Sequence, residues 1–161
     1  MTSNVFENLF VLELANNHWG KLERGLKIIR DFARVVRFND VHAAIKLQFR
    51  DVDSFIHRDF RDRSDIRYIK KTLDTPMPWE NLKAMVDAVR EAGMLTMVTP
   101  FDEVSVDKCV EFGVEILKIA SSDIRDKTLL AKIASTGLPV IASSGGAELA
   151  HIDELVEFFT S

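Results

Sequence analysis

Cysteine is almost absent from this sequence of 161 residues, which contains a single one at position 109. One cysteine cannot form a disulfide within the chain and cannot supply a CxxC metal site. Long apolar runs are also missing, and none approaches the roughly 20 residues that a membrane-spanning helix needs. The first residues, Met1 to Asn4, lack the basic start and the apolar stretch of a signal peptide. These absences predict a cytoplasmic protein without disulfides.

An excess of positive charge is missing as well. The chain carries 21 basic and 25 acidic residues, which gives a formal net charge of −4 and a pI near 5.6. A role in nucleic-acid binding therefore has no electrostatic support, and an anionic ligand would need a local cluster of cations. The hydrophobic content of 47% is ordinary for a soluble globular protein, and the length suits one domain or part of a larger one.

Short apolar segments alternate with amphipathic ones, and this alternation predicts strands and helices in turn. The expected strands are residues 10–15, 41–49, 95–98, 116–120 and 139–142, and the expected helices are residues 21–37, 79–92, 102–112, 127–135 and 147–159. The apolar positions of the last helix that are expected to face the core are Leu149, Ile152, Leu155, Val156 and Phe159. Residues 50–78 are predicted to form a long, charge-rich connection with a short helix near residues 66–72.

Two α/β architectures with parallel strands fit this order: an open doubly wound sheet and a (β/α)8 barrel. Neither the dinucleotide-binding pattern GxGxxG nor the P-loop pattern occurs, which weakens the nucleotide-binding open sheet. A complete barrel has eight strands and about 250 residues. We therefore predict an α/β fold with a parallel (β/α) barrel of the TIM type, in which residues 1–161 form the N-terminal portion with the first five βα units.

Polar residues at the ends of the expected strands indicate where a site would lie. In the second strand, Lys46 and Gln48 alternate with aliphatic residues, so they would face away from the helices. Similar residues follow the other strands, namely Glu13, Asn16, Asn17, His18, Thr99, Lys118, Ser121, Ser143 and Ser144. Active sites of parallel α/β proteins lie at the carboxyl ends of the strands, so this convergence predicts a site there.

A small, doubly anionic substrate would suit these groups. Two lysines and several hydroxyls can bind its oxygen atoms, and Gly145-Gly146 lets the backbone approach it. Ser121, Ser122 and Asp123 are expected to begin a helix directly after the fourth strand, and its free amide groups would add to the anion site.

Each of these residues also has a purely structural interpretation. Glu13 would then be the ion-pair partner of Lys46 or Lys118, and Lys118 would extend from the strand end to solvent. His18 would be a turn residue, and the serines after the fifth strand would only form a tight turn. Cys109 is expected to fill a small space in the core.

At these residues the sequence resembles the sialic-acid synthase family of the NeuB type, TIM-barrel enzymes that condense phosphoenolpyruvate with an N-acetylated aminosugar. The matching segments are residues 13–20, 44–48, 99–102, 118–121 and 133–145, in the family's order along nearly the whole chain. The long connection at residues 50–78 is more similar to the branch of spore-coat polysaccharide synthases. The resemblance implies a transferase of sialic-acid and polysaccharide biosynthesis that acts as a homodimer.

The resemblance also implies roles for individual residues. The residues that would bind the carboxylate and phosphate of phosphoenolpyruvate are Lys46, Thr99, Lys118, Ser121 and Ser143, with Gln48 beside them. Glu13, Asn17 and His18 would line the sugar side of the pocket, and Glu13 and His18 would be catalytic. A divalent cation, manganese or magnesium, would polarise the sugar aldehyde, and its two histidine ligands belong to later strands outside this chain.

The sequence departs from the family's pattern at three places. Trp19 stands where the family usually has Asn or Glu, Ser122-Asp123 replaces Gly-Glu, and Ser144-Gly145-Gly146 replaces Thr-Gly-Met. We interpret these changes as a different sugar substrate with the same reaction. Two other functions stay open: a Schiff-base aldolase with Lys118 or Lys46 as nucleophile, and a non-catalytic half-barrel that binds a partner chain.

Overall fold

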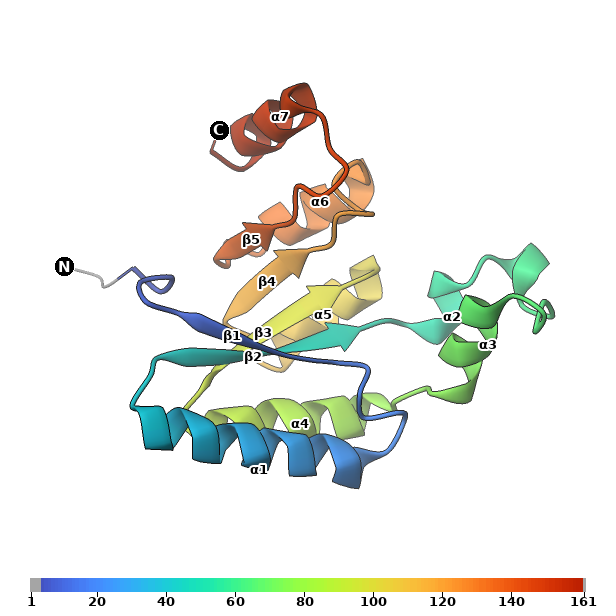
Figure 1. The fold of residues 1–161 in the computed structure, drawn as a ribbon. Helices are drawn as coiled ribbons and strands as arrows, with labels where there is room; N and C mark the ends of the chain where they lie inside the picture. The colour runs from blue at the N-terminus through green and yellow to red at the C-terminus, as the bar shows by residue number, and fades with distance from the viewer. Residues whose placement is uncertain (1–3, 161) are drawn as a thin grey trace.

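The computed structural model describes residues 4–160. Five parallel strands form one sheet in the order β1 (Phe10–Ala15), β2 (Ala43–Phe49), β3 (Leu95–Pro100), β4 (Ile116–Ile119) and β5 (Val140–Ala142). The helices are α1 (Leu22–Asn39), α2 (Val52–Phe55), α3 (Arg67–Asp74), α4 (Trp79–Glu91), α5 (Glu103–Glu111), α6 (Lys127–Ala134) and α7 (Leu149–Thr160), with a 3₁₀ turn η1 (Arg58–Phe60). Figure 1 shows this arrangement.

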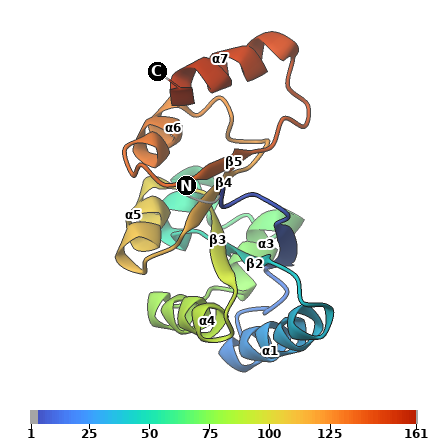
Figure 2. The same cartoon turned by 90° about the vertical axis from the view of Figure 1, so that its left-hand side faces the viewer.

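Each strand pairs with the strand that precedes it in the sequence. A doubly wound sheet would reverse its strand order at a switch point, and the sheet within residues 4–160 has no such reversal. In Figure 2, helices α1, α4, α5 and α6 follow one another along one side of the curved sheet. The predicted α/β class with five parallel strands is therefore confirmed.

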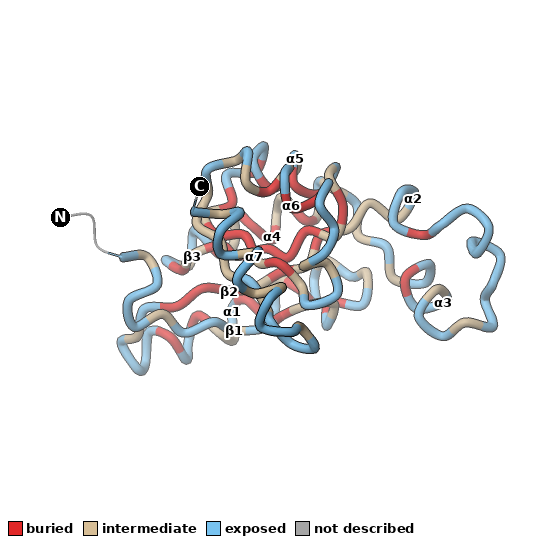
Figure 3. The backbone as a smooth tube through the Cα atoms, turned by 90° about the horizontal axis from the view of Figure 1, so that it is seen from above, coloured by how far each residue is buried: buried red, intermediate tan, exposed pale blue. Residues whose placement is uncertain are grey.

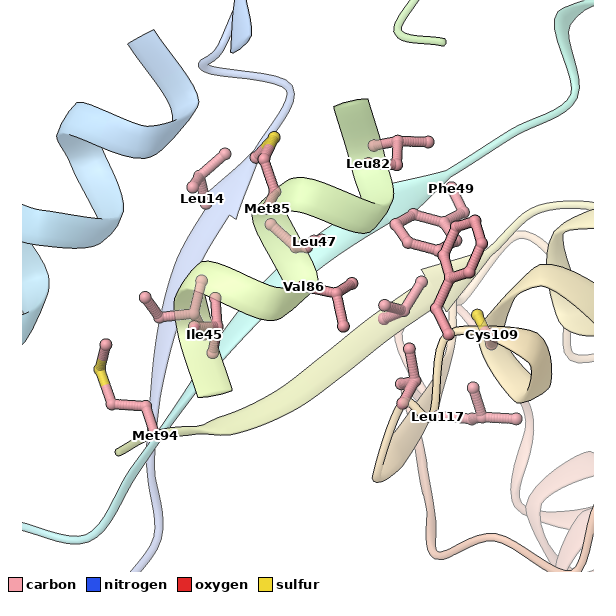
Figure 4. Close-up of a cluster of buried hydrophobic side chains, with 14 of the residues drawn as sticks. Leu14, Ile45, Leu47, Phe49, Leu82, Met85, Val86, Met94, Cys109 and Leu117 are labelled. Atoms are coloured by element: carbon pink, nitrogen blue, oxygen red, sulfur yellow. The ribbon is translucent and has the colours of Figure 1, made fainter. Parts of the chain in front are cut away.

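The main core lies between the sheet and these helices. Ile45, Leu47 and Phe49 of β2 are buried there, as their alternation with polar residues predicted. Figure 4 shows β2 side chains beside Leu82, Met85 and Val86 of α4, with Cys109 of α5 nearby; the full exclusion of Cys109 from solvent agrees with its predicted place in the core.

The opposite face of the sheet is divided along the strands. Its amino-terminal part is a small apolar cluster of Ala44, Met97 and Ile116, which packs against Val5 and Leu9 of the segment before β1. The polar residues identified from the sequence come later on the same strands. The apolar cluster therefore covers this face near the amino-terminal ends of the strands, and the polar groups lie on it near the carboxyl ends.

The connection between β2 and α4 extends beyond the carboxyl end of β2, as Figure 1 shows. It contains α3 near its predicted place and, in addition, α2 and η1, which the sequence did not predict. Figure 3 shows that its backbone is largely exposed, with buried positions such as Ile56 and Thr72. None of the helices within residues 4–160 has the length and apolar character to cross a membrane.

Two expectations about helices were wrong. After β4 the chain makes a turn at Ser121–Arg125, and α6 begins only after Asp126, whose carboxylate accepts a hydrogen bond from the Leu129 amide at 3.0 Å. No helix N-terminus therefore faces an anion at Ser121, because Asp126, and not Asp123, is the capping residue.

The second wrong expectation concerns α7. Leu149 and Val156 were predicted to be buried, but they are 79% and 57% exposed. Leu155 and Phe159 pack partly against the core. The physical reason is that β5 has three residues and lies at the edge of the described sheet, so it offers too little surface to cover the whole apolar face of α7.

Phe49 provides a direct test of this core. Its ring is fully buried and makes edge-on contacts with Trp79 and Phe112, at centroid distances of 5.9 and 6.1 Å. Phe49→Ala is expected to lower the free energy of unfolding by about 3–5 kcal/mol, measured by urea denaturation. Phe38→Ala, at an 89% exposed position of α1, is the matched control and should change stability by less than about 0.5 kcal/mol. Equal effects of the two substitutions would contradict the assignment of the core.

Candidate functional site

The strand register places the polar residues of four strands on one face of the sheet. Glu13 pairs with Lys46 across β1 and β2, and Gln48 pairs with Thr99 across β2 and β3. Val98 pairs with Leu117, so Thr99 is level with Lys118 one residue further on. Since paired residues of neighbouring parallel strands point to the same side, these side chains share the face opposite the main core.

Glu13 and Lys46 form an ion pair on this face. The ammonium group belongs to a side chain that is 13% exposed, whereas the side chain of Glu13 is 47% exposed. The predicted ion pair between Glu13 and Lys46 is therefore confirmed. The exposed carboxylate remains open to solvent and to a ligand.

Lys118 lies close enough to this pair for their charges to interact. Burial lowers the pKa of Lys118, and the ammonium group of Lys46 lowers it further, while the carboxylates of Glu13 and Asp123 act in the opposite direction. Two ammonium groups on one partly buried face repel each other, so the binding of an anion between them would be favourable. The structure thus brings together the two lysines that the sequence singled out.

Asp123 lies beside this group in the turn that follows β4. Burial raises its pKa, and Asp126 raises it further, whereas Ser122 and Lys118 act against that shift. Its Oδ2 atom is buried without a hydrogen-bond partner among the described residues. The carboxylate therefore counters only part of the positive charge of the lysines.

Thr99 supplies a hydroxyl group next to Lys118. The residue is 2% exposed, and within residues 4–160 its Oγ1 atom has no hydrogen-bond partner. Buried hydroxyl groups in native proteins are nearly always hydrogen-bonded. The unpaired hydroxyl of Thr99 at the end of β3 is therefore a candidate hydrogen-bond donor to a ligand.

Ser121 and Ser143 lie on neighbouring loops. The Ser143 amide donates a hydrogen bond to the carbonyl of Ile119 at 3.0 Å, which holds the loop after β5 against the end of β4. A Cβ atom at Gly145 would lie 3.7 Å from the Cβ of Ser121, so the two loops are in contact there. Both serines thus follow the strands that carry Lys118 and Ile141, which are paired in the register.

Arg50 is a functional candidate that the sequence analysis missed, because it was assigned to the long connection. It follows the alternation of Lys46 and Gln48 by two residues, which is the signal that could have identified it. Its Nη2 atom donates to the side-chain oxygen of Gln48 at 2.9 Å. Its guanidinium group also lies over the rings of Phe55 and Phe101, at 5.2 and 4.8 Å from their centroids.

His18 and Asn17 belong to the turn after β1 and have different environments. Asn17 is exposed and lines a pocket with Gln48 and Arg50. His18 is buried, and its Nδ1 atom accepts a hydrogen bond from the Gly20 amide at 3.0 Å. Burial lowers the pKa of His18 to about 4, with a further contribution from the charge of Arg50, so the ring is neutral near pH 7. This geometry matches the turn role considered for His18, whose catalytic role stays a prediction.

The three histidines other than His18 lie apart from the candidate site. His42 and His57 are exposed, and His151 of α7 is partly buried, with its Nδ1 atom 3.1 Å from Nη2 of Arg125. These three residues come from separate parts of the fold.

A divalent cation does not fit the groups that the described residues bring together. Within residues 4–160, no cluster of three or more His, Cys, Asp or Glu side chains is arranged to hold a metal ion. The carboxylate of Glu13 is paired with Lys46, and Nδ1 of His18 is occupied by the Gly20 amide. The described residues therefore do not by themselves supply a metal centre.

The pKa of His18 predicts a pH dependence of stability. Its folded pKa of about 4 is below the ordinary histidine pKa of 6.5, so the unfolded chain takes up a proton first as the pH falls. The free energy of unfolding should therefore decrease between about pH 6.5 and pH 4, by at most about 1.4 kcal/mol per pH unit from this group, and this loss is absent above about pH 7. Urea denaturation at several pH values measures the slope.

His18→Asn is the control for this prediction. The side-chain oxygen of asparagine can replace Nδ1 as acceptor for the Gly20 amide, but it does not titrate. We expect a smaller slope below pH 6.5 in this variant. Identical slopes in the two proteins, or an NMR titration of His18 centred near 6.5, would contradict the assigned environment.

The chain is similar to several known proteins along most of its length. A family model described as the NeuB family matches residues 39–161. A crystal structure of a Chromobacterium violaceum protein that bears the name spore coat polysaccharide biosynthesis protein E is 40% identical, with a TM-score of 0.90 over 94% of this chain and 45% of that chain. An N-acetylneuraminic acid synthetase from Leptospira borgpetersenii, crystallised in complex with citrate, is 29% identical, with a TM-score of 0.78 over 94% of this chain and 49% of that chain.

A curated relative gives the same result from sequence. The N,N'-diacetyllegionaminic acid synthase of Campylobacter jejuni is 27% identical over 154 residues, which are 92% of this chain and 45% of the relative. The chain thus spans less than half the length of each of these three proteins.

Proposed function

The chain belongs to the NeuB family, as its sequence predicted, and we propose that it forms the phosphoenolpyruvate-binding part of a nonulosonic-acid synthase. Its relatives include proteins named as N-acetylneuraminic acid and N,N'-diacetyllegionaminic acid synthases, which supports a condensation reaction of this general kind. The complete enzyme would join phosphoenolpyruvate to an N-acetylated aminosugar and release phosphate.

The proposal is supported most by one observation: Lys46 and Lys118 lie on the same face of the sheet, close enough for the charge of one to lower the pKa of the other. Phosphoenolpyruvate carries a carboxylate and a phosphate group, so it would relieve this repulsion. The unpaired hydroxyl of Thr99 would donate to one of its oxygens, and Ser121, Ser143 and Gln48 would complete the contacts.

The expected chemistry is what the resemblance to the NeuB-type synthases implies. The C2–C3 double bond of phosphoenolpyruvate supplies the electron pair for a bond from C3 to the aldehyde carbon of the open-chain sugar, the aldehyde oxygen takes up a proton to become a hydroxyl group, and positive charge develops at C2. Water adds at C2 and loses a proton, and the bond between C2 and the phosphate oxygen then breaks as the new C2 hydroxyl loses its proton, which gives a keto group and inorganic phosphate. The two lysines would hold the phosphate and carboxylate in position throughout, and the carboxylate of Glu13 would lie beside the reacting carbons.

The five βα units would be the N-terminal portion of a (β/α)8 barrel. Support comes from the sequential parallel order and from the helices that follow one another along one side of the curved sheet. The polar face with Lys46 and Lys118 would then line the mouth of the barrel, and the apolar cluster below it would fill the interior.

The remaining parts of the proposal concern the complete enzyme. A divalent cation, manganese or magnesium, would be bound by histidines outside residues 4–160, since the described residues do not supply its ligands. When bound, it would act as a Lewis acid on the sugar aldehyde. We propose a cytoplasmic homodimer, with Trp19 and the turn at Asp123 altering the choice of sugar.

Removal of either lysine tests the anion site. Lys46→Ala and Lys118→Ala are each expected to weaken phosphoenolpyruvate binding by roughly 1–3 kcal/mol, because each loses a charge-assisted contact. Isothermal titration calorimetry measures the affinity, with Lys83→Ala as the control, since Lys83 pairs with Asp87 on the outer helix α4. Unchanged affinity in both variants would remove the two lysines from the site.

The 161-residue chain alone is expected to show no synthase turnover, because residues 4–160 do not bring together a metal centre. Phosphate release in the presence of manganese and phosphoenolpyruvate, with N-acetylmannosamine and in a parallel assay N-acetylglucosamine 6-phosphate as acceptor, measures this activity. Sustained release above the rate without protein would show that the chain is sufficient by itself.

A Schiff-base aldolase is the second candidate, because the lowered pKa of Lys118 would favour the neutral amine that such an enzyme needs. Treatment with pyruvate and borohydride separates the two functions. An adduct on Lys118 or Lys46, located by mass spectrometry, would support the aldolase, whereas phosphoenolpyruvate binding without an adduct would support the synthase. A non-catalytic half-barrel would show neither result.

A further inference from the structure

A pocket of about 290 Å³ with two cationic side chains, Arg50 and Lys71, lies next to the candidate site. It is formed by the turn after β1, the end of β2 and helix α3. The residues that line it are Ala15, Asn16, Asn17, Gln48, Arg50, Tyr68, Lys71 and Thr72. Gln48 belongs both to this pocket and to the polar face that carries Lys46, so the two regions are adjacent.

Arg50 is held firmly in this pocket by neutral groups. Gln48 accepts from Nη2 at 2.9 Å, and the Asn16 oxygen, in the amide orientation that satisfies both groups, accepts from Nη1 and Nη2 at 3.2 and 3.3 Å. The rings of Phe55 and Phe101 lie against the guanidinium plane. These contacts fix its position, but neither amide neutralises its charge.

Among the described residues, Asp102 is the carboxylate that interacts with Arg50 through its charge, and its two oxygens accept hydrogen bonds from backbone amides. Asp102 raises the pKa of Arg50, while burial, the larger effect, lowers it. The Oδ1 atom of Asp102 accepts from the Ser105 amide at 2.7 Å and its Oδ2 atom accepts from the Asp51 amide at 2.8 Å. The Nε atom of Arg50 is buried and has no partner among residues 4–160. The charge of Asp102 offsets only part of the cost of burying this cation, so an anionic ligand in the pocket would be favoured.

Lys71 contributes a second positive charge to the lining of the pocket. It lies on α3, and its ammonium group is 5.7 Å from the centroid of the Trp19 ring. The neighbouring Lys70 instead forms an ion pair with Asp74 at 2.6 Å, and it does not line the pocket. The two lysines therefore differ in a way that permits a matched comparison.

We propose that this pocket binds an anionic substituent, a carboxylate or a phosphate, on the sugar that the site accepts, through Arg50 and Lys71. The inference rests on the proposed function, because it assigns the second pocket to the acceptor while Lys46 and Lys118 hold phosphoenolpyruvate. A neutral sugar would leave the guanidinium charge balanced only in part, by Asp102, so the charge of the acceptor would be part of the specificity. Arg50 would then be a specificity-determining residue for this reaction.

Calorimetric titration of the 161-residue chain tests the proposal with three probes: N-acetylglucosamine, N-acetylglucosamine 6-phosphate and glucuronate. The wild type should bind one or both of the anionic sugars at least tenfold more tightly than the neutral sugar, and the preferred probe distinguishes phosphate from carboxylate. Arg50→Gln should remove at least tenfold of that affinity, and Arg50→Lys should retain part of it. No preference for an anionic sugar in the wild type would overturn the proposal.

Lys71→Gln and Lys70→Gln provide the matched pair. The first should weaken binding of the anionic sugar severalfold, and the second should leave it unchanged, while circular dichroism and thermal melting verify that each variant is folded. Equal behaviour of the two variants, together with unchanged binding in Arg50→Gln, would overturn the proposal. Failure of the proposed function has a separate readout. It would appear as no binding of phosphoenolpyruvate, or as binding whose affinity is the same in Lys46→Ala, Lys118→Ala and the wild type.

Discussion

Repulsion between the ammonium groups of Lys46 and Lys118 is the constraint on which the site depends. The pKa of Lys118 is lowered both by burial and by Lys46, and Glu13 and Asp123 counter this effect only in part. A fold selected for stability alone would gain from an apolar side chain at one of these positions. The retention of both charges on one face is explained most simply by a ligand that carries the opposite charge.

The scaffold positions these groups through the two faces of the sheet. One face is buried against α1, α4, α5 and α6, and the other is apolar only near the amino-terminal ends of the strands, where Val5 and Leu9 cover it. Alternation along each strand sends consecutive residues to opposite faces, so the strand that packs Leu47 and Phe49 into the core also directs Lys46 and Gln48 outward from it. The site is therefore built on rigid strands, with loops added at their ends.

The sequence could predict what depends on local pattern. The alternation in β2 identified the core face and the polar face, and the polar strand ends located Lys46, Thr99 and Lys118 on one side. It could not predict features that depend on tertiary competition. The helix predicted over residues 127–135 is confirmed as α6, but the helix start expected at Ser121 is a turn, since the fold uses Asp126 and not Asp123 as the cap. Arg50 was missed because a charged residue at the start of a long connection has the pattern of a solvated loop, although aromatic rings from α2 and from the end of β3 surround it.

Trp19 has an environment with a practical consequence. Its backbone is in the left-handed region, at φ 53°, and the charged groups of Arg24 on α1 and Lys71 on α3 lie 5.8 and 5.7 Å from the centroid of its half-exposed ring. The other tryptophan of the chain, Trp79, has a different environment, because it packs edge-on against the buried ring of Phe49. Indole emission responds to nearby charge, so a change in the distance between Lys71 of α3 and the Trp19 ring would alter the fluorescence of Trp19.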